Sequence, residues 1–531
     1  MKSINKYQLA FYLLVLAYVI YALLYIYKSS FIVSGVRYFV LFDDAMVSMR
    51  YARNLAQGFG LVWNPGGERI EGYTNPLWVL FMAVIHFFPI PAAKTSLIVQ
   101  LSGAVFLVAN LFVVKKIANK LTTDPFVALL AVAFTAFYAP LNNWGLLGTE
   151  VSLLTLIISL AALLGLKALH TRQTSLWLFV LLGSSTLIRM DMAIPYLVVL
   201  GFLLLANPLE RKRNLVWGLG LLVIFLAGQT LFRLWYYGDP LPNTYYLKMV
   251  GYPALLRMAR GLYVLFMLLW NFNWIIFLLP LAILLFRRDR SVVFLSLVFL
   301  GQLTYSVYVG GDAWEHKGGS NRYIAIAIPI FFTLLAYTLC LLKDFLVKHL
   351  KPDSHKAEIA ANIGLVSIAV IMLINMNYLG DFKSLGKWLL LQTPDYVRGN
   401  EEYVKIALDV QKATTPEAKI AVVSAGAIPY FTDRYAIDLL GKGDPIIARL
   451  KARNTDAISN MELFRPGHMK WDYDYSIGKL RPDAIVQMWA KEEALPYLMT
   501  EYKTGKSDHG FTFYLLADSP NIQWEEIEVL P

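Results

Sequence analysis

The chain has 531 residues, of which 57% are hydrophobic and only 16% are charged, and its mean hydropathy is +0.52. This apolar excess excludes an ordinary soluble globular protein and indicates a polytopic membrane protein surrounded by lipid. The formal net charge of +11 at pH 7 would suit nucleic-acid binding, but the Lys and Arg residues stand in short clusters between apolar segments, where they set membrane topology. We therefore expect no nucleic-acid partner.

Apolar segments long enough to cross a bilayer recur along the chain, since a spanning helix needs about 20 mostly apolar residues. About eleven candidates are Leu9–Ile26, Ser96–Val114, Phe126–Pro140, Val151–Leu169, Leu176–Ile188, Ala193–Ala206, Leu215–Tyr236, Leu262–Phe286, Val292–Val309, Tyr323–Leu342 and Ile359–Tyr378. The first is interpreted as a retained helix rather than a cleaved signal peptide, because no convincing small-residue cleavage site follows it.

Basic clusters follow every second span, and the positive-inside rule places such clusters in the cytoplasm. They are Lys2 and Lys6; Lys115, Lys116 and Lys120; Lys167 and Arg172; Arg211, Lys212 and Arg213; Arg287, Arg288 and Arg290; and Lys343, Lys348, Lys351 and Lys356. This pattern predicts a cytoplasmic N-terminus and an extracytoplasmic chain after Tyr378. It also requires Leu77–Phe88, which two prolines follow, to be a re-entrant or interfacial helix rather than a span.

The first extracytoplasmic loop, residues 28–95, holds a long polar stretch near the start of the chain. Its polar residues include the adjacent carboxylates Asp43 and Asp44, a helix-like run with Arg50 and Arg53, and a second acidic pair, Glu68 and Glu71. Later loops place further non-basic polar groups on the same predicted face: Asn142, Asn143, Thr149, Glu150, Asp191, Asp239, Asn243, Tyr245 and the segment from Gly310 to Arg322. Function is therefore expected on the outer face.

The sequence predicts two domains: a transmembrane catalytic domain at residues 1–379 and a soluble extracytoplasmic tail at residues 380–531. The tail alternates strand-like runs that end in turn residues, KIAVVSAGAIPY, YAIDLL and RPDAIVQMW, with helix-like stretches. About 150 residues suffice for one small domain, and this alternation predicts an α/β fold.

Four motifs of the membrane half carry a resemblance to a known family. They are FDDAMVSMRYARNLAQGFGLVWNPGGERIEGYTNPLW at Phe42–Trp78, GTE at Gly148–Glu150, PNTYYLK at Pro242–Lys248 and YVGGD at Tyr308–Asp312. With them the chain resembles the GT-C superfamily of polyprenyl-phosphate-sugar-dependent glycosyltransferases, and within it the actinobacterial terminal arabinofuranosyltransferases. The first motif is long and fairly specific, whereas the other three are short. The tail segments SAGAIPYFTDRYAIDLLG and FRPGHMKWDYDYSIG also look like tails of bacterial envelope glycosyltransferases.

The resemblance implies a multi-pass enzyme of the bacterial inner (cytoplasmic) membrane with its active site outside. It would transfer a sugar, arabinofuranose being the first candidate, with inversion from a polyprenyl-phosphate donor to an envelope glycan or protein. A carboxylate must accept the acceptor's proton, and cations must hold the phosphate. The base is assigned to Asp43 or Asp44, and the phosphate ligands to Lys248, Arg322 and Arg53. The substrate-binding candidates are Glu68, Glu71, Tyr73, Asn75, Asn143, Glu150, Asn243, Tyr245, Asp312 and His316.

Structural interpretations compete with several of these roles. Asp43 and Asp44 precede a helix-like run, where carboxylates commonly cap a helix or complement its dipole. Arg50 and Arg53 would serve equally well as partners of Glu68 or Glu71, and Arg189 is expected to pair with Asp191. His316, with Asp312 and Glu315, has a metal-ligand composition, but a flexible acceptor-site loop is the preferred interpretation. No cofactor or metal is expected, because a monophosphate donor needs a divalent ion less than a diphosphate donor does.

Three other functions compete with that of a glycosyltransferase. A transporter or flippase of lipid-linked sugars should have broken or polar helices at the bilayer midplane and repeated halves, and no repeat is found. A structural protein would leave the aspartate pair without a use. A glycosidase would need two carboxylates on opposite sides of the scissile bond, so a requirement for a lipid-linked donor separates it from the transferase.

Overall fold

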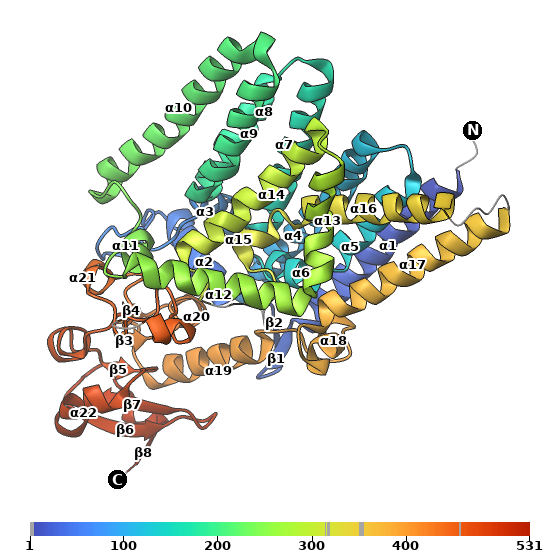
Figure 1. Ribbon diagram of the computed structural model, residues 1–531. Coiled ribbons are helices and arrows are strands. Elements are labelled where there is room, and N and C mark those ends of the chain that lie inside the picture. The colour runs from blue at the N-terminus through green and yellow to red at the C-terminus, as the bar shows by residue number, and fades with distance from the viewer. Residues whose placement is uncertain (1–4, 314, 316–318, 350–354, 456–457, 531) are drawn as a thin grey trace. The chain divides into compact units, whose positions relative to one another are not determined.

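The computed structural model describes residues 5–313, 315, 319–349, 355–455 and 458–530. The chain is mostly helical and divides into two compact units, each assembled from three separate segments (Figure 1). The helical unit consists of Met1–Lys28, Leu101–Gly228 and Arg257–Pro394. The loop–tail unit consists of Ser29–Gln100, Gln229–Leu256 and Asp395–Pro531. The first predicted loop and residues 395–531 of the predicted tail therefore belong to one compact unit, and residues 380–394 belong to the helical unit. The predicted division at residue 380 stays a prediction.

The helical unit is built around α16, whose residues Ile328–Cys340 are all buried. Helices α5, α13, α14 and α17 pack against it. The helices that lie wholly or partly in this unit are α1 (Lys6–Lys28), α4 (Ala92–Leu121), α5 (Pro125–Ala136), α6 (Ala139–Leu146), α7 (Val151–Thr171), α8 (Leu176–Ile188), η1 (Met190–Met192), α9 (Ala193–Ala206), η2 (Pro208–Glu210), α10 (Arg211–Tyr237), α12 (Ala254–Phe272), α13 (Trp274–Phe286), α14 (Arg290–Val309), α15 (Arg322–Ala325), α16 (Ile328–His349), α17 (His355–Tyr378) and α18 (Phe382–Trp388).

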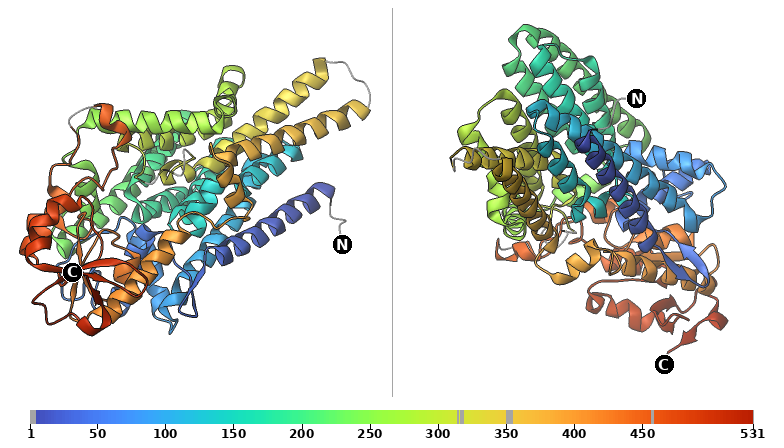
Figure 2. Two further views of the ribbon diagram at one scale, coloured as in Figure 1. Left: turned by 90° about the horizontal axis from the view of Figure 1, so that it is seen from below. Right: turned by 90° about the vertical axis from the view of Figure 1, so that its right-hand side faces the viewer.

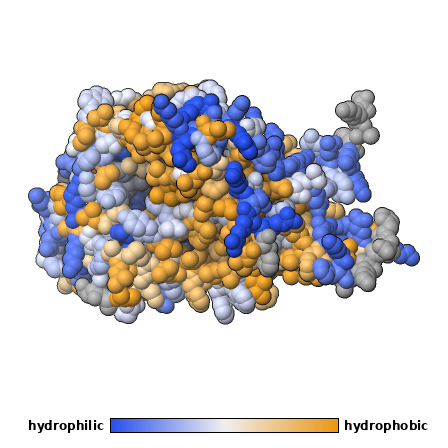
Figure 3. All heavy atoms as spheres, turned by 45° about the horizontal axis from the view of Figure 1, so that its top comes forward, coloured by the Kyte–Doolittle hydropathy of each residue, from blue (hydrophilic) through white to orange (hydrophobic). Residues whose placement is uncertain are grey.

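Within the described residues, eight helices are long and apolar enough to cross a membrane, and the bent pair α5–α6 makes a ninth if it counts as one span. Large apolar side chains such as Leu205, Leu209 and Trp235 are more than three-quarters exposed. Figure 3 shows hydrophobic residues spread over the exposed surface, as expected where lipid replaces water. The expectation of a polytopic helical membrane protein is confirmed.

Four predicted spans differ from the observed helices. The predicted spans Leu176–Ile188 and Ala193–Ala206 form α8 and α9, which have only 13 and 14 residues and are not among the eight. The predicted span Leu262–Phe286 is wrong, because α12 ends at Phe272 and α13 starts at Trp274. Asn273 between them adopts a left-handed φ of 67° and accepts a hydrogen bond from the Ile275 N–H, and asparagine tolerates that conformation better than most residues do. The predicted span Phe126–Pro140 is bent by 56° between α5 and α6.

The loop–tail unit begins with a hairpin, β1 (Phe31–Val33) and β2 (Val36–Tyr38), whose turn at Ser34 and Gly35 has positive φ at both residues. Helix α2 (Asp43–Ala56) packs against α3 (Pro76–His86), the segment predicted not to span the membrane, and 11 residues are too few to do so. The remaining helices of this unit are α11 (Asn243–Met249), α19 (Val397–Ala413), α20 (Ala427–Thr432), α21 (Pro445–Arg449), η3 (Ile458–Glu462), η4 (Asp474–Lys479), α22 (Lys491–Thr500) and η5 (Trp524–Glu526).

The tail contains a six-stranded mixed sheet in the order β4-β3-β5-β7-β6-β8. The last strands lie close to the C-terminus in the red part of the chain (Figure 2). Its strands are β3 (Lys419–Val422), β4 (Tyr435–Asp438), β5 (Ala484–Ile485), β6 (Tyr502–Lys506), β7 (Thr512–Leu516) and β8 (Glu528–Val529). Strand β3 pairs in parallel with β4 and β5, and the other pairs are antiparallel. The three runs predicted as strands contain β3, β4 and β5, so the expected α/β fold of the tail is confirmed.

Candidate functional site

The aspartate pair lies at the start of α2, in the loop–tail unit, and both side chains are partly buried. The Ala427 N–H at the start of α20 donates to Asp43 Oδ1 at 2.8 Å. Asp44 forms an ion pair with the Lys442 ammonium of the tail. Both carboxylates of the first loop are therefore bound by groups that lie almost 400 positions later in the sequence.

The first turn of α2 bears on the interpretation that the aspartates cap this helix. The N-cap position of α2 is occupied by Phe42, and Asp43 and Asp44 are the first two residues of the helix. Asp43 instead binds the first turn of α20, and both carboxylates still lie where the dipole of α2 favours negative charge. Burial raises the pKa of Asp43 to about 6, against the lowering effects of the Ala427 N–H and the Lys442 charge.

Lys442 lies on a short loop, Leu440–Gly443, that two polar side chains hold in place. The Asp438 carboxylate accepts hydrogen bonds from the N–H groups of Leu440 and Gly443 at 2.9 and 2.7 Å. The Asn243 Nδ2 group, from α11, donates to the Lys442 carbonyl oxygen at 3.0 Å. The Lys442 backbone is thus fixed independently of its side chain. Burial lowers the pKa of Lys442, but the Asp44 carboxylate outweighs this effect, so the net pKa is raised.

Two further basic side chains lie near this ion pair, Lys248 on α11 and His468 in the tail. A Cβ atom at Gly467, the residue before His468, would lie 3.2 Å from Lys248 Cγ, so the tail segment packs directly on Lys248. Burial, with the charges of Lys442 and Lys248, lowers the pKa of His468 to about 4 against the opposing charge of Asp44. His468 is therefore neutral at pH 7 and lies within electrostatic range of all three charged groups.

The arginines of α2 are bound to the tail rather than to the acidic residues of the loop. Arg50 is 1% exposed and donates to the carbonyl oxygens of Trp63, Pro429 and Arg434. Arg53 forms an ion pair with Asp433 at 2.6 Å. The predicted pairing with Glu68 or Glu71 is therefore wrong, and the phosphate role of Arg53 competes with this contact.

The acidic residues of the loop have separate environments. Glu71 forms a two-point ion pair with Arg233 of α10, with Nε–Oε2 and Nη2–Oε1 distances of 2.6 and 3.0 Å. The two side chains are 3% and 1% exposed. Glu68 is exposed and lines a cavity of about 420 Å³ together with Glu71, Asn243 and Tyr237.

The other predicted substrate ligands of this unit are placed as follows. The Tyr73 hydroxyl contacts the Tyr237 hydroxyl at 2.8 Å, and Asn75 accepts a hydrogen bond from Ser48 Oγ at 2.8 Å. Both residues are buried, which suits a packing role in the loop. Tyr245 is 41% exposed.

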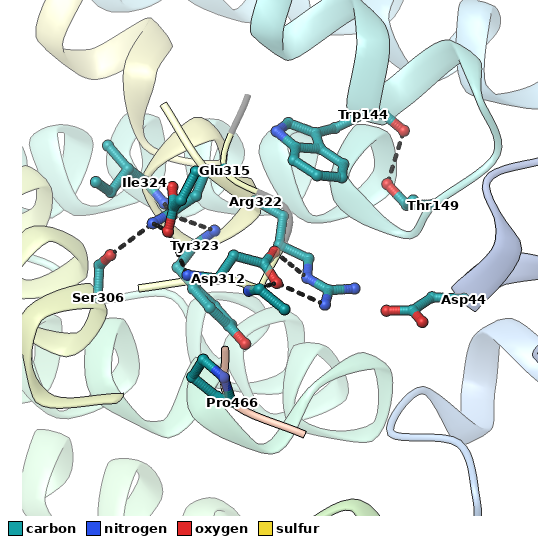
Figure 4. Close-up of polar contacts among 12 residues, drawn as sticks. Asp44, Trp144, Thr149, Ser306, Asp312, Glu315, Arg322, Tyr323, Ile324 and Pro466 are labelled. Carbon is teal, nitrogen blue, oxygen red and sulfur yellow. Dashed lines mark hydrogen bonds and ion pairs between the residues drawn. The ribbon is translucent and has the colours of Figure 1, made fainter. Parts of the chain in front are cut away.

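In the helical unit, Asp312 and Arg322 face each other across the Gly310–Arg322 segment (Figure 4). The guanidinium binds the carboxylate at two points, with Nε–Oδ2 and Nη2–Oδ1 distances of 2.6 and 3.0 Å. Glu315 folds back to accept a hydrogen bond from the Asp312 N–H, and burial raises its pKa to about 8, with Asp312 adding to the effect. The Glu315 carboxyl group is therefore mainly protonated at pH 7, and it lies beside the YVGGD motif that ends at Asp312.

The remaining predicted residues of the helical unit are also partnered. Arg189 binds Asp191 at 2.5 Å, as expected, and lies 3.5 Å from Glu150. The Asn143 side chain accepts a hydrogen bond from the Tyr25 hydroxyl at 2.6 Å. His316 lies outside the described residues, and within the described part of the chain no three His, Cys, Asp or Glu side chains form a group able to hold a metal ion.

Sequence reasoning missed Lys442, Asp438, His468 and Arg233. The segment YAIDLLGKGDP did contain a signal, because an aspartate at the end of a strand commonly binds the N–H groups of a following glycine-rich turn. No local signal indicates that this turn packs on α2.

Comparisons with known proteins bear on the tail and on the fold. Residues 395–516 match the family model described as a domain of unknown function, DUF8728. No curated protein sequence matches the chain. Among solved structures, the chain resembles ArnT from Cupriavidus metallidurans at 12% identity and a TM-score of 0.56, over 94% of this chain and 97% of that one.

The chain also resembles the oligosaccharyltransferase of Archaeoglobus fulgidus in two crystal forms. The form with zinc and sulfate gives 13% identity and a TM-score of 0.52, over 98% of this chain and 74% of the other. The apo form gives 13% identity and a TM-score of 0.50, over 99% and 76%. At these identities the likeness concerns architecture. The chain has the GT-C-like fold predicted from its sequence: a polytopic helical membrane domain followed by a C-terminal α/β domain.

Proposed function

We propose that the protein is an inverting glycosyltransferase that moves a sugar from a polyprenyl-phosphate donor to an acceptor hydroxyl at the outer face of the bacterial inner membrane. The acceptor is an envelope glycan or protein, and arabinofuranose is the first candidate sugar. The observation that supports this proposal best is the aspartate pair on a loop of a GT-C-like fold, with Asp44 held beside the cation of Lys442.

We assign the general base to Asp44. Its side chain is 20% exposed, so an acceptor hydroxyl can approach it. Asp43 is less suited, because its Oδ1 receives the Ala427 N–H and lies against Gly426, where a Cβ atom would be only 2.7 Å away. Asp43 is therefore a positioning residue that holds the start of α2 against α20.

The reaction balances with one carboxylate. The acceptor oxygen forms the new bond to the anomeric carbon while its proton passes to Asp44. The bond from the anomeric carbon to the phosphate oxygen breaks, and its electron pair leaves with the polyprenyl phosphate. A phosphate is a good leaving group without protonation, so no second acid is needed, and no metal or cofactor is proposed.

Several predicted roles remain part of this proposal. Lys248 is retained as a phosphate ligand, and Glu68 and Asn243 are retained as sugar ligands because they line the cavity of the loop–tail unit. The phosphate role of Arg322 and the substrate roles of Asp312, Asn143 and Glu150, all in the helical unit, stay predictions from the sequence. Glu71, Tyr73, Asn75 and Arg53 are reassigned to holding the loop–tail unit together, because each is already bound within that unit.

The test is sugar transfer by the purified protein from a synthetic polyprenyl-phosphate donor, with Asp44→Asn and Asp43→Asn as matched variants. Loss of a general base typically costs 10²–10⁴-fold in rate. We expect Asp44→Asn to lose about that much while it still binds donor, and Asp43→Asn to retain more activity but to unfold at a lower temperature.

Two results would contradict the proposal. Equal activity in both variants would remove the carboxylate mechanism. Absence of turnover with every lipid-linked donor, combined with movement of labelled donor across proteoliposome membranes, would establish the transporter instead. The broken helix α5–α6 alone does not favour a transporter, because its Asn142 and Asn143 side chains are bound by Tyr18 and Tyr25 of α1.

A further inference from the structure

His468 lies within electrostatic range of Lys442, Lys248 and Asp44, and the proposed mechanism has used only part of this cluster. Lys442 and His468 come from the tail, Lys248 comes from α11, and Asp44 comes from the first loop. All four side chains are partly rather than fully buried. Asp43 also lies within electrostatic range of Lys442, so with His468 neutral the two ammonium groups are matched by two carboxylates, and a phosphate must compete with Asp44 for Lys442.

The tail holds Lys442 in this cluster through backbone contacts. The Lys442 carbonyl oxygen receives the Asn243 amide, and Asp438 binds the N–H groups on either side of the lysine. Gly72 of the first loop approaches so closely that a Cβ atom there would lie 2.8 Å from the Lys442 carbonyl oxygen. Because the loop is already ordered, the Lys442 cation can stabilise an anion without a further entropic cost of ordering that loop.

Proton transfer changes the charge that Lys442 encounters. Before reaction, Asp44 is an anion that neutralises Lys442, and the donor phosphodiester carries one negative charge. After the acceptor's proton reaches Asp44, that carboxyl is neutral and the departing polyprenyl phosphate carries two negative charges. The total charge is unchanged, but the Lys442 cation has lost its partner at the step in which the phosphate gains charge.

We propose that the tail completes the donor site, with Lys442 and Lys248 forming the subsite for the phosphate of the lipid-linked donor and His468 packed beside them. Lys442 contributes most, because it exchanges its bond to Asp44 for one to the leaving phosphate. Neutral His468 donates its one ring N–H, on Nδ1, to the Pro466 carbonyl oxygen at 3.3 Å, so it lines the site without donating to the phosphate. This inference rests on the proposed function, and it gives the tail a direct part in the reaction.

To test this inference, binding of the lipid phosphate and transfer of the sugar are measured in separate experiments. The binding probe is a polyprenyl phosphate that carries no sugar, titrated against the full-length protein in detergent. Lys442→Met should weaken binding about tenfold to hundredfold, as expected for one lost charge-assisted hydrogen bond, and Lys442→Arg should restore most of it. Asp44→Asn should bind this probe more tightly than the wild type, because Lys442 then lacks its competing carboxylate.

The control is Lys451→Met, an exposed lysine of the same tail, which should change neither binding nor transfer. Thermal unfolding of each variant shows whether the loop is intact, and the backbone contacts of Lys442 predict that it is. Undiminished binding in Lys442→Met would overturn the inference, as would equal binding in Asp44→Asn and the wild type. If binding follows the predicted order but no donor supports transfer, the phosphate subsite stands and the glycosyltransferase proposal fails.

Discussion

Arg233 and Glu71 illustrate how a buried charge in this protein depends on its partner. Their ion pair is bidentate and nearly inaccessible to solvent. Removing one member of such a pair leaves an uncompensated charge and typically costs 3–5 kcal/mol, whereas replacing both with apolar residues is often neutral.

We therefore expect Arg233→Met to lower the free energy of unfolding by roughly 3–5 kcal/mol, and the double variant Arg233→Met/Glu71→Leu to recover most of that loss. Chemical denaturation in detergent measures both variants. If the single and double variants are equally destabilised, the ion pair is not the source of the cost, and Arg233 contributes through packing alone.

Glu315 predicts a pH dependence of stability. Its pKa is raised from 4.5 to about 8 by burial and by Asp312, so the folded chain holds a proton that the unfolded chain releases. The groups that face it are the Asp312 N–H, the Asp312 and Arg260 charges and the Asn321 amide. Its contribution is complete below about pH 4.5 and is lost as pH rises toward about 8.

Glu315→Gln should accordingly flatten the decline in melting temperature between these pH values. The exposed Glu528→Gln serves as the matched control and should leave the profile unchanged. A Glu315→Gln profile that follows the wild type would show that the carboxyl is ionised in the folded protein.

Candidate site residues could be predicted from the sequence where they stand together in one motif. The residues that bind them could not be predicted when they lie far away in the sequence. The aspartate pair and the GGD segment were found because their residues adjoin in sequence. The pairing of Arg189 with Asp191 was predictable for the same reason. Lys442 was missed because its carboxylate partner lies 398 positions away, and hydrogen bonds of that kind leave no local pattern.

At the scale of single elements, α20 is positioned by one close contact. Gly426 precedes this helix, and a Cβ atom there would lie 2.0 Å from the Asp43 carbonyl oxygen. The φ of Gly426 is −102°, which any residue can adopt, so the absence of a side chain is required by space alone.

Gly426→Ala should thus push α20 away from α2 and destabilise the protein by about 1–3 kcal/mol, the usual cost of overpacking. Gly399→Ala in α19 is the control, because nothing lies within 4 Å of its Cβ position and alanine favours a helix. Thermal unfolding should therefore move in opposite directions for the two variants. A neutral Gly426→Ala would mean that α2 and α20 separate readily.

Elements were predicted well where periodicity or composition was strong. Long apolar segments predicted membrane-spanning helices, and short segments rich in β-branched and aromatic residues predicted three strands of the tail. The break between α12 and α13 was missed because apolar residues continue on both sides of Asn273. Only the left-handed conformation of that residue separates the two helices.

At the scale of the whole molecule, topology is testable because the chain contains one cysteine, Cys340, which is buried in α16. The wild type should consequently resist a membrane-impermeant maleimide. Met499 in the tail is 81% exposed and Gln173 lies in a short exposed connection, so either position accepts a single new cysteine.

In intact cells, Met499→Cys should react with the maleimide, whereas Gln173→Cys should react only after permeabilisation. These results follow from the predicted cytoplasmic location of the basic clusters. The reverse pattern would invert the topology and place the aspartate pair in the cytoplasm, where an extracytoplasmic transferase cannot work.

Composition and charge predicted the membrane class, and motif likeness predicted the GT-C-like fold, but nothing in the sequence indicated that the first loop and the tail form one unit. The contacts of Arg50 and Asn64 with residues of the tail connect segments that the sequence treats as independent. Contacts between distant segments depend on the complete fold, and no local pattern specifies them.

The buried position of Arg50 also has a consequence for biosynthesis. Its partner Pro429 is synthesised 379 residues later, which corresponds to roughly 20–75 s at ribosomal rates of about 5–20 residues per second. During that interval the tail carbonyls that accept hydrogen bonds from the Arg50 guanidinium have not yet been synthesised. The first loop therefore cannot complete its folding until the tail has left the ribosome. The first loop is among the first segments made and among the last to mature, and premature termination anywhere before the tail would leave it exposed to proteolytic quality control.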